Sequence, residues 1–548
     1  MSALPRILGG GRGRSVALLV VLALGQAAAT GLAAFATRDV FAAFRAPAAA
    51  LPWLALCALA ATGLIIGALR FYERLTAEKV GQHFAAALRM KLFKHMARVS
   101  ARDLAARRNG ALALRFVGDL TAVRAWVSLG LARLISALIV LPIATGVLFY
   151  MNPEIGLAVA VPVAAGLVLS ALLGPRLGPA HRRLRSRRAR LAADMSERIP
   201  HAPELRLLGR MQIETRRLQT RTEKLVDAAL IRARGAALLR AIPDVISGIA
   251  ATCVFGVALW RDLPAAEAAG ALAAVGLMLQ PMRALAGVWD RHRAWRIARE
   301  KCLNLLMVPK LEIERDEDVT LPPALPNLIF ADVSAGALTD MTATALPGQR
   351  IGIIGGNGAG KSTLLSLAAG LEHPEAGQVL MGDLSPAALS PRERRETIAL
   401  IGARSPVLKG SLRRALTMGV QGRPSDAQIL ELADDFGLSK VVRRLGGLDG
   451  TVAEAGRNLS AGELRRVLLT RAALSKPRLL LMDEPDDALD QDGPALVQKL
   501  IEDCDATTLL ITHNMRIARM MDVLWRVEDG RIVETGAPDD LLVDTDLT

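Results

Sequence analysis

Aromatic residues and cysteines are both scarce in this chain. Aromatic side chains make up 3 % of the 548 residues, and none interrupts the Arg-rich stretch 181–190. A surface that stacks nucleic-acid bases needs such rings beside its basic groups, so we expect no nucleic-acid partner. The cysteines Cys57, Cys253, Cys302 and Cys504 form no C-x-x-C pair. Their spacing indicates neither a zinc site nor a disulfide scaffold.

Acidic residues are outnumbered by basic ones. The chain has 68 Lys and Arg against 53 Asp and Glu, a formal net charge of +15. Such a charge is compatible with nucleic-acid binding or with a membrane protein that has basic cytosolic loops. The Arg-rich stretches lie between long apolar runs, which favours the membrane protein.

Long apolar segments are what the chain has in abundance. A helix needs about 20 apolar residues to cross a lipid bilayer. The first segment is longer than the core of a cleaved signal peptide and is followed by further spans, so we interpret it as a retained helix. Six segments are long enough, at residues 15–36, 50–69, 127–150, 155–174, 241–260 and 265–286.

The loops between these segments predict the orientation. Residues 70–124 and 175–240 are dense in Arg and Lys, whereas the turns at 151–154 and 261–264 are very short. Because positive charge is retained on the cytosolic side, we expect a multi-pass protein of the inner (cytoplasmic) membrane with both termini in the cytosol. The long loops have helical patterning. We therefore expect paired helices that project into the cytosol rather than helices that lie on the lipid surface.

The composition changes after residue 312. Residues 313–326 are polar and bounded by prolines, as in a linker. Beyond them, apolar runs alternate with helical patterns, which predicts an α/β domain with a largely parallel sheet. The predicted fold class is thus an α-helical six-span membrane domain over 1–312 and an α/β domain over 327–548, which the motifs below identify as a nucleotide-binding domain. Strands are predicted at 328–333, 349–354, 479–482, 508–512 and 523–527.

A phosphate-binding loop opens the second domain. Residues 355–363 read Gly-Gly-Asn-Gly-Ala-Gly-Lys-Ser-Thr, between an apolar run and a helical pattern. Phosphates then meet a helix N-terminus, where free N–H groups and the helix dipole favour an anion. Lys361 can reach the β- and γ-phosphates of ATP, and Ser362 can place its hydroxyl on Mg²⁺. Because glycines let the backbone wrap around phosphates, we assign the loop to the nucleotide: Gly355, Asn357, Gly358, Ala359, Gly360, Lys361, Ser362 and Thr363.

Two adjacent carboxylates follow another apolar run. Residues 478–485 read Arg-Leu-Leu-Leu-Met-Asp-Glu-Pro, which predicts a buried strand that ends at Asp483 and Glu484. Asp483 can hold Mg²⁺, and Glu484 can accept a proton from attacking water. Such a pair can also mark the start of a helix. Its place about 120 residues after the phosphate-binding loop favours the nucleotide site.

With a third motif, the chain resembles the ATP-binding cassette family. Leu459-Ser-Ala-Gly-Glu463 is similar to the family signature. The resemblance implies that Ser460 and Gly462 contact the γ-phosphate of an ATP held by a second subunit, and that Asp490 belongs to a segment crossing the dimer interface. It also implies that His513 senses the γ-phosphate. The residues that would carry ATP hydrolysis are Lys361, Glu484 and His513.

Six spans and a C-terminal cassette in one chain resemble a half-size exporter. The resemblance implies an ATPase coupled to transport, which pairs with a second half-transporter. The turns near 100–112 and 200–212 would be its coupling helices, and Glu454 would touch the intracellular helices. The segment 70–75, Arg-Phe-Tyr-Glu-Arg-Leu, also resembles the thiol-exporting subfamily.

Three positions depart from the family pattern. Ala337 ends a stretch without a ring where the family has an adenine-stacking aromatic residue. Ala403 stands where a glutamine normally links Mg²⁺ to the membrane domain, and Ala461 replaces a glycine of the signature. The hydrolytic residues are present, so we expect hydrolysis to be retained and nucleotide sensing and coupling to be altered.

Three functions follow as alternatives. The first is an exporter that pairs with itself, and the second is a weakly hydrolysing or regulatory half that needs a different partner chain. The third, a soluble cassette ATPase, is disfavoured by the six apolar spans. The transported substrate stays open among lipids, amphiphilic drugs, peptides and small thiols. Arg240, Asp244 and Arg283 could line the transport cavity, or mark the cytosolic membrane boundary.

Overall fold

The computed structural model of the chain contains two compact units. The first comprises Met1–Met96 and Arg108–Met307, and the second comprises Ala97–Arg107 and Val308–Thr548. The short segment Ala97–Arg107 therefore belongs to the second unit, although both of its sequence neighbours belong to the first. The residues described are 4–44, 51–106, 112, 115–176, 178–311, 321, 324–402 and 405–542.

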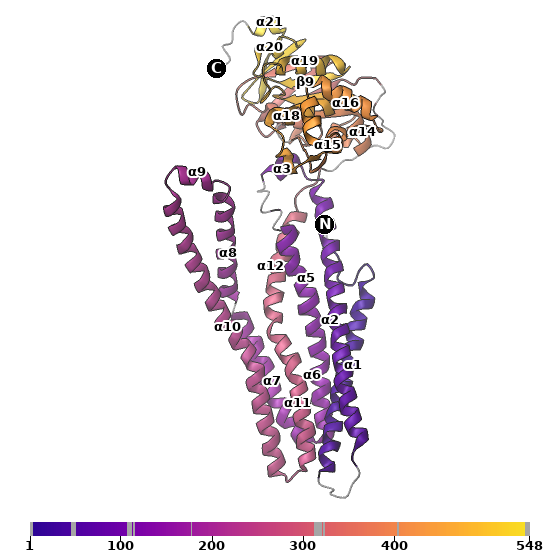
Figure 1. The fold of residues 1–548 in the computed structure, drawn as a ribbon, viewed down its shortest axis with the longest axis vertical. Coiled ribbons are helices and arrows are strands. Elements are labelled where there is room, and N and C mark those ends of the chain that lie inside the picture. The colour runs from indigo at the N-terminus through magenta and orange to yellow at the C-terminus, as the bar shows by residue number, and fades with distance from the viewer. Residues whose placement is uncertain are drawn as a thin grey trace. The chain divides into compact units, whose positions relative to one another are not determined.

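Long helices build the first unit (Figure 1). Six of them are long and apolar enough to cross a membrane, which confirms the predicted six-span domain. They are α1 (Arg12–Ala43), α2 (Trp53–Met96), α6 (Ala132–Met151), α7 (Pro153–Arg176), α10 (Met211–Trp260) and α11 (Ala265–Ala286). The other elements are π-helical η1 (Arg115–Asp119), α5 (Leu120–Ala125), π-helical η2 (Trp126–Leu131), α8 (Gly178–Arg198), α9 (Ala202–Leu207) and α12 (Val288–Leu306).

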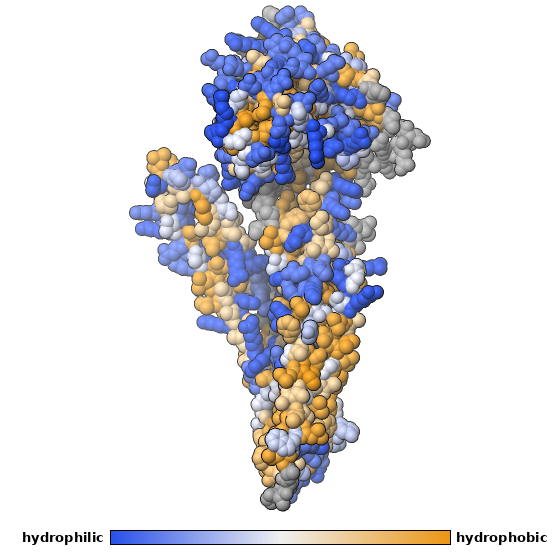
Figure 2. Space-filling view, turned by 45° about the vertical axis from the view of Figure 1, so that its right-hand side comes forward, coloured by the Kyte–Doolittle hydropathy of each residue, from blue (hydrophilic) through white to orange (hydrophobic). Residues whose placement is uncertain are grey.

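Two of these helices are much longer than a membrane span. α2 has 44 residues and α10 has 50, about 66 and 75 Å at the α-helical rise of 1.5 Å per residue. The polar part of α10 pairs with α8 in a hairpin closed by α9 (Figure 1). Near its tip, Glu214 accepts hydrogen bonds from Arg198 Nε at 2.6 Å and Arg217 Nη1 at 2.8 Å. Figure 2 shows hydrophobic side chains gathered over the opposite end of this unit.

Small residues allow the membrane-type helices to pack closely. Ala23, Ala27 and Ala34 of α1 are fully buried. A Cβ atom on Gly270 of α11 would lie 2.8 Å from the carbonyl oxygen of Ala34. Association of helices in lipid depends on such close van der Waals contact, so alanine and glycine supply the packing that the scarce aromatic residues do not.

The second unit is built on a six-stranded sheet of order β11-β10-β3-β9-β8-β5. The strands from β10 to β5 run parallel, and β11 is antiparallel to β10. This confirms the predicted α/β class. The strands are β3 (Arg350–Ile354), β5 (Ile398–Ile401), β8 (Leu479–Asp483), β9 (Thr507–Ile511), β10 (Val523–Glu528) and β11 (Arg531–Gly536).

Two smaller sheets accompany it. An antiparallel sheet has the order β2-β1-β4, with β1 (Leu328–Ala335), β2 (Leu338–Ala345) and β4 (Ala376–Met381). The strands β6 (Gly410–Ser411) and β7 (Thr451–Val452) pair separately. The short Ala97–Arg107 segment contributes one helix, α3 (Ala101–Ala105).

Hydrophobic clusters cover both faces of the six-stranded sheet. Leu480 and Met482 of β8 belong to one cluster, and Leu479 and Leu481 to the other. A strand buried on both faces needs an uninterrupted apolar run, which explains the apolar sequence before Asp483.

Helices also belong to the second unit. They are α13 (Lys361–Ala368), α14 (Pro391–Thr397), α15 (Leu412–Thr417), α16 (Asp426–Asp435), α17 (Ser439–Leu445), α18 (Ala461–Ser475), α19 (Gly493–Asp503), α20 (Met515–Ala518) and α21 (Pro538–Leu541), with the 3-10 turns η3 (Pro386–Ala388) and η4 (Glu454–Gly456).

Candidate nucleotide site

The loop 355–363 connects the carboxyl end of β3 to α13. Gly355 has φ 145°, and a Cβ atom there would collide with the carbonyl oxygen of Val527 on β10. Gly360 has φ 100°, and a Cβ atom there would lie 2.6 Å from Leu338 Cδ2. Both positions need glycine, because side chains are strained at positive φ and the space is filled. The loop can therefore follow phosphate groups closely. Asn357, Ala359 and Thr363 lie along the same loop and first helical turn.

The ammonium group of Lys361 lies inside this loop. Its Nζ donates hydrogen bonds to the carbonyl oxygens of Gly355 at 2.5 Å and Gly356 at 2.9 Å. Burial lowers the pKa of Lys361, while Glu484 and Asp483 act in the opposite direction. A confined cation beside free N–H groups is the electrostatic environment that a triphosphate needs.

Ser362 and Asp483 lie together, as the sequence predicts. Ser362 Oγ donates a hydrogen bond to Asp483 Oδ2 at 2.8 Å. Mg²⁺ prefers such oxygen donors, and it commonly takes one or two protein ligands together with phosphate oxygens and water. Among the described residues, no group of three or more His, Cys, Asp and Glu side chains could hold a metal. The Ser362 hydroxyl and the Asp483 carboxylate are oxygen donors of the kind that fits Mg²⁺ bound together with a nucleotide.

Glu484 and His513 follow the neighbouring parallel strands β8 and β9. His513 Nε2 lies 3.4 Å from Glu484 Oε1. Glu484 has φ 48°, and its N–H donates to the carbonyl oxygen of Ile511 at 3.0 Å. Left-handed backbone at a non-glycine residue is uncommon and concentrates at functional sites. The carboxylate is half exposed, so it can be reached by water.

The signature segment forms the start of α18. Ser460 Oγ accepts the N–H of Glu463 at 3.1 Å, and Glu463 Oε2 accepts the N–H of Ser460 at 2.9 Å. This reciprocal cap leaves the O–H of Ser460 available as a donor, because a hydroxyl can accept and donate at once. A Cβ atom on Gly462 would lie 2.9 Å from the carbonyl oxygen of Ala488. The helix start thus offers donors on a tightly packed surface.

The segment that contains Asp490 is fastened to the same helix. Asp490 Oδ1 accepts a hydrogen bond from Arg466 Nη2 at 2.7 Å, and Arg465 Nε donates to the carbonyl oxygen of Asp487 at 3.3 Å. Within the described part of the chain, no hydrogen bond or ion pair joins the signature residues Ser460 and Gly462 to the phosphate-binding loop. The structure therefore brings together Lys361, Ser362, Asp483, Glu484 and His513, and leaves Ser460, Gly462 and Asp490 in a second group.

One charged residue beside this site was not predicted from the sequence. Arg102 of α3 contacts Glu375 Oε1 through Nη1 at 2.5 Å and Glu372 Oε2 through Nη2 at 3.2 Å. The N–H of Gly336 donates to the same Glu375 oxygen at 3.3 Å. These bonds lower the pKa of Glu375.

Arg102 thus lies beside the stretch that ends at Ala337 and lacks the expected ring. Ser100 caps α3 by accepting the N–H of Asp103 at 3.1 Å, and α3 lies in the turn near 100–112 where the family resemblance implies a coupling helix.

Three predicted features lie wholly or partly outside the described residues. Ala403, at the expected glutamine position, and the neighbouring Arg404 are among them. So is most of the predicted linker 313–326 and the end of the first predicted coupling turn, residues 107–111. Their predicted roles stay predictions.

Comparisons with known proteins agree with both units. The family model for the ABC transporter transmembrane region matches residues 15–270, and the ABC transporter model matches residues 338–487. The chain is 24 % identical over 509 residues to an ATP-dependent lipid A-core flippase of Syntrophus aciditrophicus, which covers 90 % of this chain and 84 % of that protein.

A second relative and a solved structure are similar over most of their length. The chain is 26 % identical over 487 residues to a glutathione/L-cysteine transport system ATP-binding/permease protein of Escherichia coli, covering 86 % of this chain and 84 % of that protein. The fold is similar to that of a bacterial Atm1-family ABC exporter with ATP bound, with a TM-score of 0.84 at 20 % identity. That match covers 98 % of this chain and 97 % of the other.

Proposed function

The chain belongs to the ABC transporters, with a transmembrane region and an ATP-binding cassette in one polypeptide, and we propose that it exports a substrate across the cytoplasmic membrane as a dimer of half-transporters. One observation carries the proposal. Lys361, the Ser362–Asp483 pair and the Glu484–His513 pair meet at one edge of the sheet. The signature helix lies apart from them, as expected if a second subunit completes the site.

Each residue then has a chemical role. The loop 355–363 and Lys361 bind and orient the phosphates. Ser362 and Asp483 would hold Mg²⁺, which would supply positive charge beside the transferred phosphoryl group. Glu484 accepts a proton from the attacking water. His513, 3.4 Å from Glu484, positions that carboxylate relative to the γ-phosphate. The O–H of Ser460 from the other subunit donates to a γ-phosphate oxygen, with the α18 N-terminus adding N–H donors.

Coupling to the membrane unit passes through Ala97–Arg107 in this proposal. Two residues of α3 attach it to the cassette. Arg102 pairs with Glu375, and the N–H of Ala101 donates to the carbonyl oxygen of Leu371 at 3.0 Å. Closure of the cassettes on ATP would carry α3 with it, and α2 with α3. Glu454, exposed on η4, is a further candidate contact. We place the cassette in the cytosol on the basis of the positive charge in the long loops.

A second function is supported by the replaced positions. Ala337, Ala403 and Ala461 favour a weakly hydrolysing half that pairs with a different chain. The relative whose name describes glutathione/L-cysteine transport and the segment 70–75 support a thiol-exporter-like version of this alternative. The transmembrane-region match argues against a soluble cassette ATPase.

Replacement of Glu484 tests the proposal. For Glu484→Gln in lipid nanodiscs we expect vanadate-sensitive ATPase activity to fall by about 10²-fold or more, the usual contribution of general base catalysis, with ATP binding retained. Glu528→Gln is a matched control, because Glu528 ends the parallel strand β10 without a partner in the site. Full activity of Glu484→Gln would overturn the assignment. Robust ATPase activity of the purified protein alone would argue against the heterodimer.

A further inference from the structure

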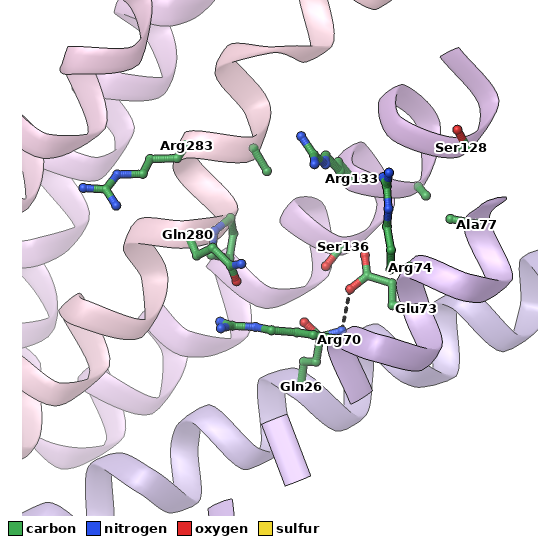
Figure 3. Close-up of a pocket in the computed structure, with 13 residues that line it drawn as sticks. Gln26, Arg70, Glu73, Arg74, Ala77, Ser128, Arg133, Ser136, Gln280 and Arg283 are labelled. Atoms are coloured by element: carbon green, nitrogen blue, oxygen red, sulfur yellow. Dashed lines mark hydrogen bonds between the residues drawn. The ribbon is translucent and has the colours of Figure 1, made fainter. Parts of the chain in front are cut away.

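A polar cavity of about 330 Å³ lies within the helical unit. Its lining comes from α1, α2, η2, α6 and α11 (Figure 3). The cavity is close to the point where the apolar part of α2 ends, at the segment 70–75. Ligand pockets have volumes of about 300 Å³ upward, so this one is of the size that suits a short peptide or a headgroup rather than a whole lipid.

The lining carries an excess of positive charge. Arg70, Arg74 and Arg133 face one carboxylate, Glu73, whose Oε2 accepts a hydrogen bond from Gln26 Nε2 at 2.6 Å. Among the described residues, no ion pair neutralises any of the three arginines. Their formal charges sum to +2 with Glu73.

The charge of the fourth arginine in the lining is balanced by a carboxylate. Arg283 pairs with Asp244 at 2.5 Å. In Figure 3 its side chain points away from Arg70, Arg74 and Arg133. Of the two roles considered for Arg283 and Asp244, marking the cytosolic membrane boundary therefore suits them better than lining the cavity.

Two polar atoms at the cavity have no partner. Arg70 Nε and Ser128 Oγ are buried and make no hydrogen bond in the described structure. Ser128 is 2 % exposed. A buried donor without an acceptor costs free energy, and such exceptions concentrate where a ligand or ion completes the bonding. Arg70 Nε can only donate, and the Ser128 hydroxyl can donate as well as accept, so an acceptor would satisfy both atoms.

We propose that this cavity binds a small organic dianion, whose carboxylate or phosphate oxygens accept hydrogen bonds from Arg70, Arg133 and Ser128. Guanidinium groups bind both kinds of oxygen through paired N–H donors. The inference rests on the proposed transport function, because it names the chemical class of the cargo. The same chemistry is found in a soluble acidic peptide and in a lipid headgroup, and the experiment separates the two.

Binding of a dianionic probe to the nucleotide-free full-length chain tests the proposal. The probe is the dipeptide glutamyl-glutamate, titrated by calorimetry into protein in phosphatidylcholine nanodiscs, and the matched neutral probe is glutaminyl-glutamine. We expect the first to bind, more weakly as salt is added, and the second not to bind. In the double variant Arg70→Gln/Arg133→Gln the affinity should fall at least tenfold, the effect of about 1.4 kcal/mol.

Two further variants control for folding and for general charge. Arg70→Lys/Arg133→Lys keeps the charge and should retain part of the affinity. Arg89→Gln removes an exposed arginine from the same helix, outside the cavity, and should leave binding unchanged. Thermal unfolding of each variant shows whether it is folded.

A lipid arm identifies the source of the anion. If nanodiscs that contain cardiolipin, whose headgroup carries two negatively charged phosphates, weaken dipeptide binding, and this competition disappears in Arg70→Gln/Arg133→Gln, the occupant is a headgroup. The proposal is overturned if neither anion binds the wild-type chain, or if both bind the double variant equally well. ATPase activity is measured on the same samples. Binding without hydrolysis would contradict the transport function alone, and hydrolysis without binding would contradict the cavity alone.

Discussion

At the scale of single residues, the hydroxyl of Ser460 has a structural role and a proposed functional role. It accepts the N–H of Glu463 within its own chain, and its O–H stays available as the donor that we propose for a γ-phosphate held by a second subunit. The carboxylate of Glu463 is itself held by Arg444 Nη2 at 2.6 Å. The structural and the functional role of Ser460 can therefore be separated by substitution.

We expect Ser460→Ala and Ser460→Asp to differ in stability and to agree in activity. Alanine loses the cap, which costs about 1 kcal/mol of stability. Aspartate keeps the cap but repels phosphate, so the chain should be as stable as wild type and both variants should lose most ATPase activity. Thermal unfolding and ATP turnover measure the two effects.

The matched control for Ser460 is Ser425. Ser425 caps α16 through the same reciprocal arrangement with Gln428, away from the site. Ser425→Ala should lose similar stability and keep its turnover. Normal turnover in Ser460→Asp would contradict the phosphate role.

At the scale of elements, α3 is fastened to the cassette by Arg102. We expect Arg102→Ala to release the segment 97–107, because one side chain contacts both Glu372 and Glu375. Hydrogen–deuterium exchange of this segment should become faster, and ATP hydrolysis should continue while its stimulation by substrate is lost. Arg392→Ala, which removes an exposed pair with Glu396 on α14, is the control. Unchanged exchange in Arg102→Ala would rule out this docking role.

The contact between Glu375 and Arg102 should also depend on pH. The N–H of Gly336 and the guanidinium of Arg102 lower the pKa of Glu375 from its ordinary value of 4.5. A carboxylate with a lowered pKa contributes stability above its ordinary pKa, and this contribution is lost as the pH falls through the lowered value. The unfolding temperature of wild type should therefore exceed that of Glu375→Gln at pH 7. The difference should shrink below pH 4.5, and a difference that grows there would contradict the assignment.

The strands show which elements can be predicted from sequence. The five predicted strands correspond to β1, β3, β8, β9 and β10, and each lies between two neighbours in its sheet. The strands that were not predicted, β2, β4, β5, β6, β7 and β11, are all at sheet edges. An interior strand is buried on both sides and needs a strong apolar run, whereas an edge strand such as β11 is largely exposed and has a weak pattern.

The site shows the same dependence on local pattern. The phosphate-binding loop and the Asp483–Glu484 pair are contiguous motifs that follow strands, so their positions could be predicted. Arg102 could not, because its partner Glu375 is 273 residues away and no motif marks either residue. The roles of Ser460, Gly462 and Asp490 depend on a second subunit and stay predictions.

At the scale of the whole molecule, the separate groups in one cassette lead to a test by mixing. Lys361→Ala removes the phosphate-binding half of each site, and Ser460→Ala removes the signature half. If two copies of this chain form the sites together, a mixed dimer contains one site in which both halves are wild type. Co-expressed variants should then regain ATPase activity above that of either variant alone, measured on dimers purified through two different tags.

The opposite result in the mixing test is equally informative. A site complete within one chain, or a dimer that forms only with a different protein, predicts no recovery. Mixing Lys361→Ala with a second Lys361→Ala chain is the matched control, because every site in that dimer is defective.

The membership of Ala97–Arg107 in the cassette unit has a consequence for biosynthesis. Arg102 and its partner Glu375 are 273 residues apart in the sequence. Ribosomes add about 5–20 residues per second, so Glu375 is synthesised about 14 to 55 s after Arg102. During that interval the first helices can enter the membrane while α3 has no surface to dock on. Docking of α3 on the cassette is therefore a late step of assembly, and a chaperone that shields this segment would act in that interval.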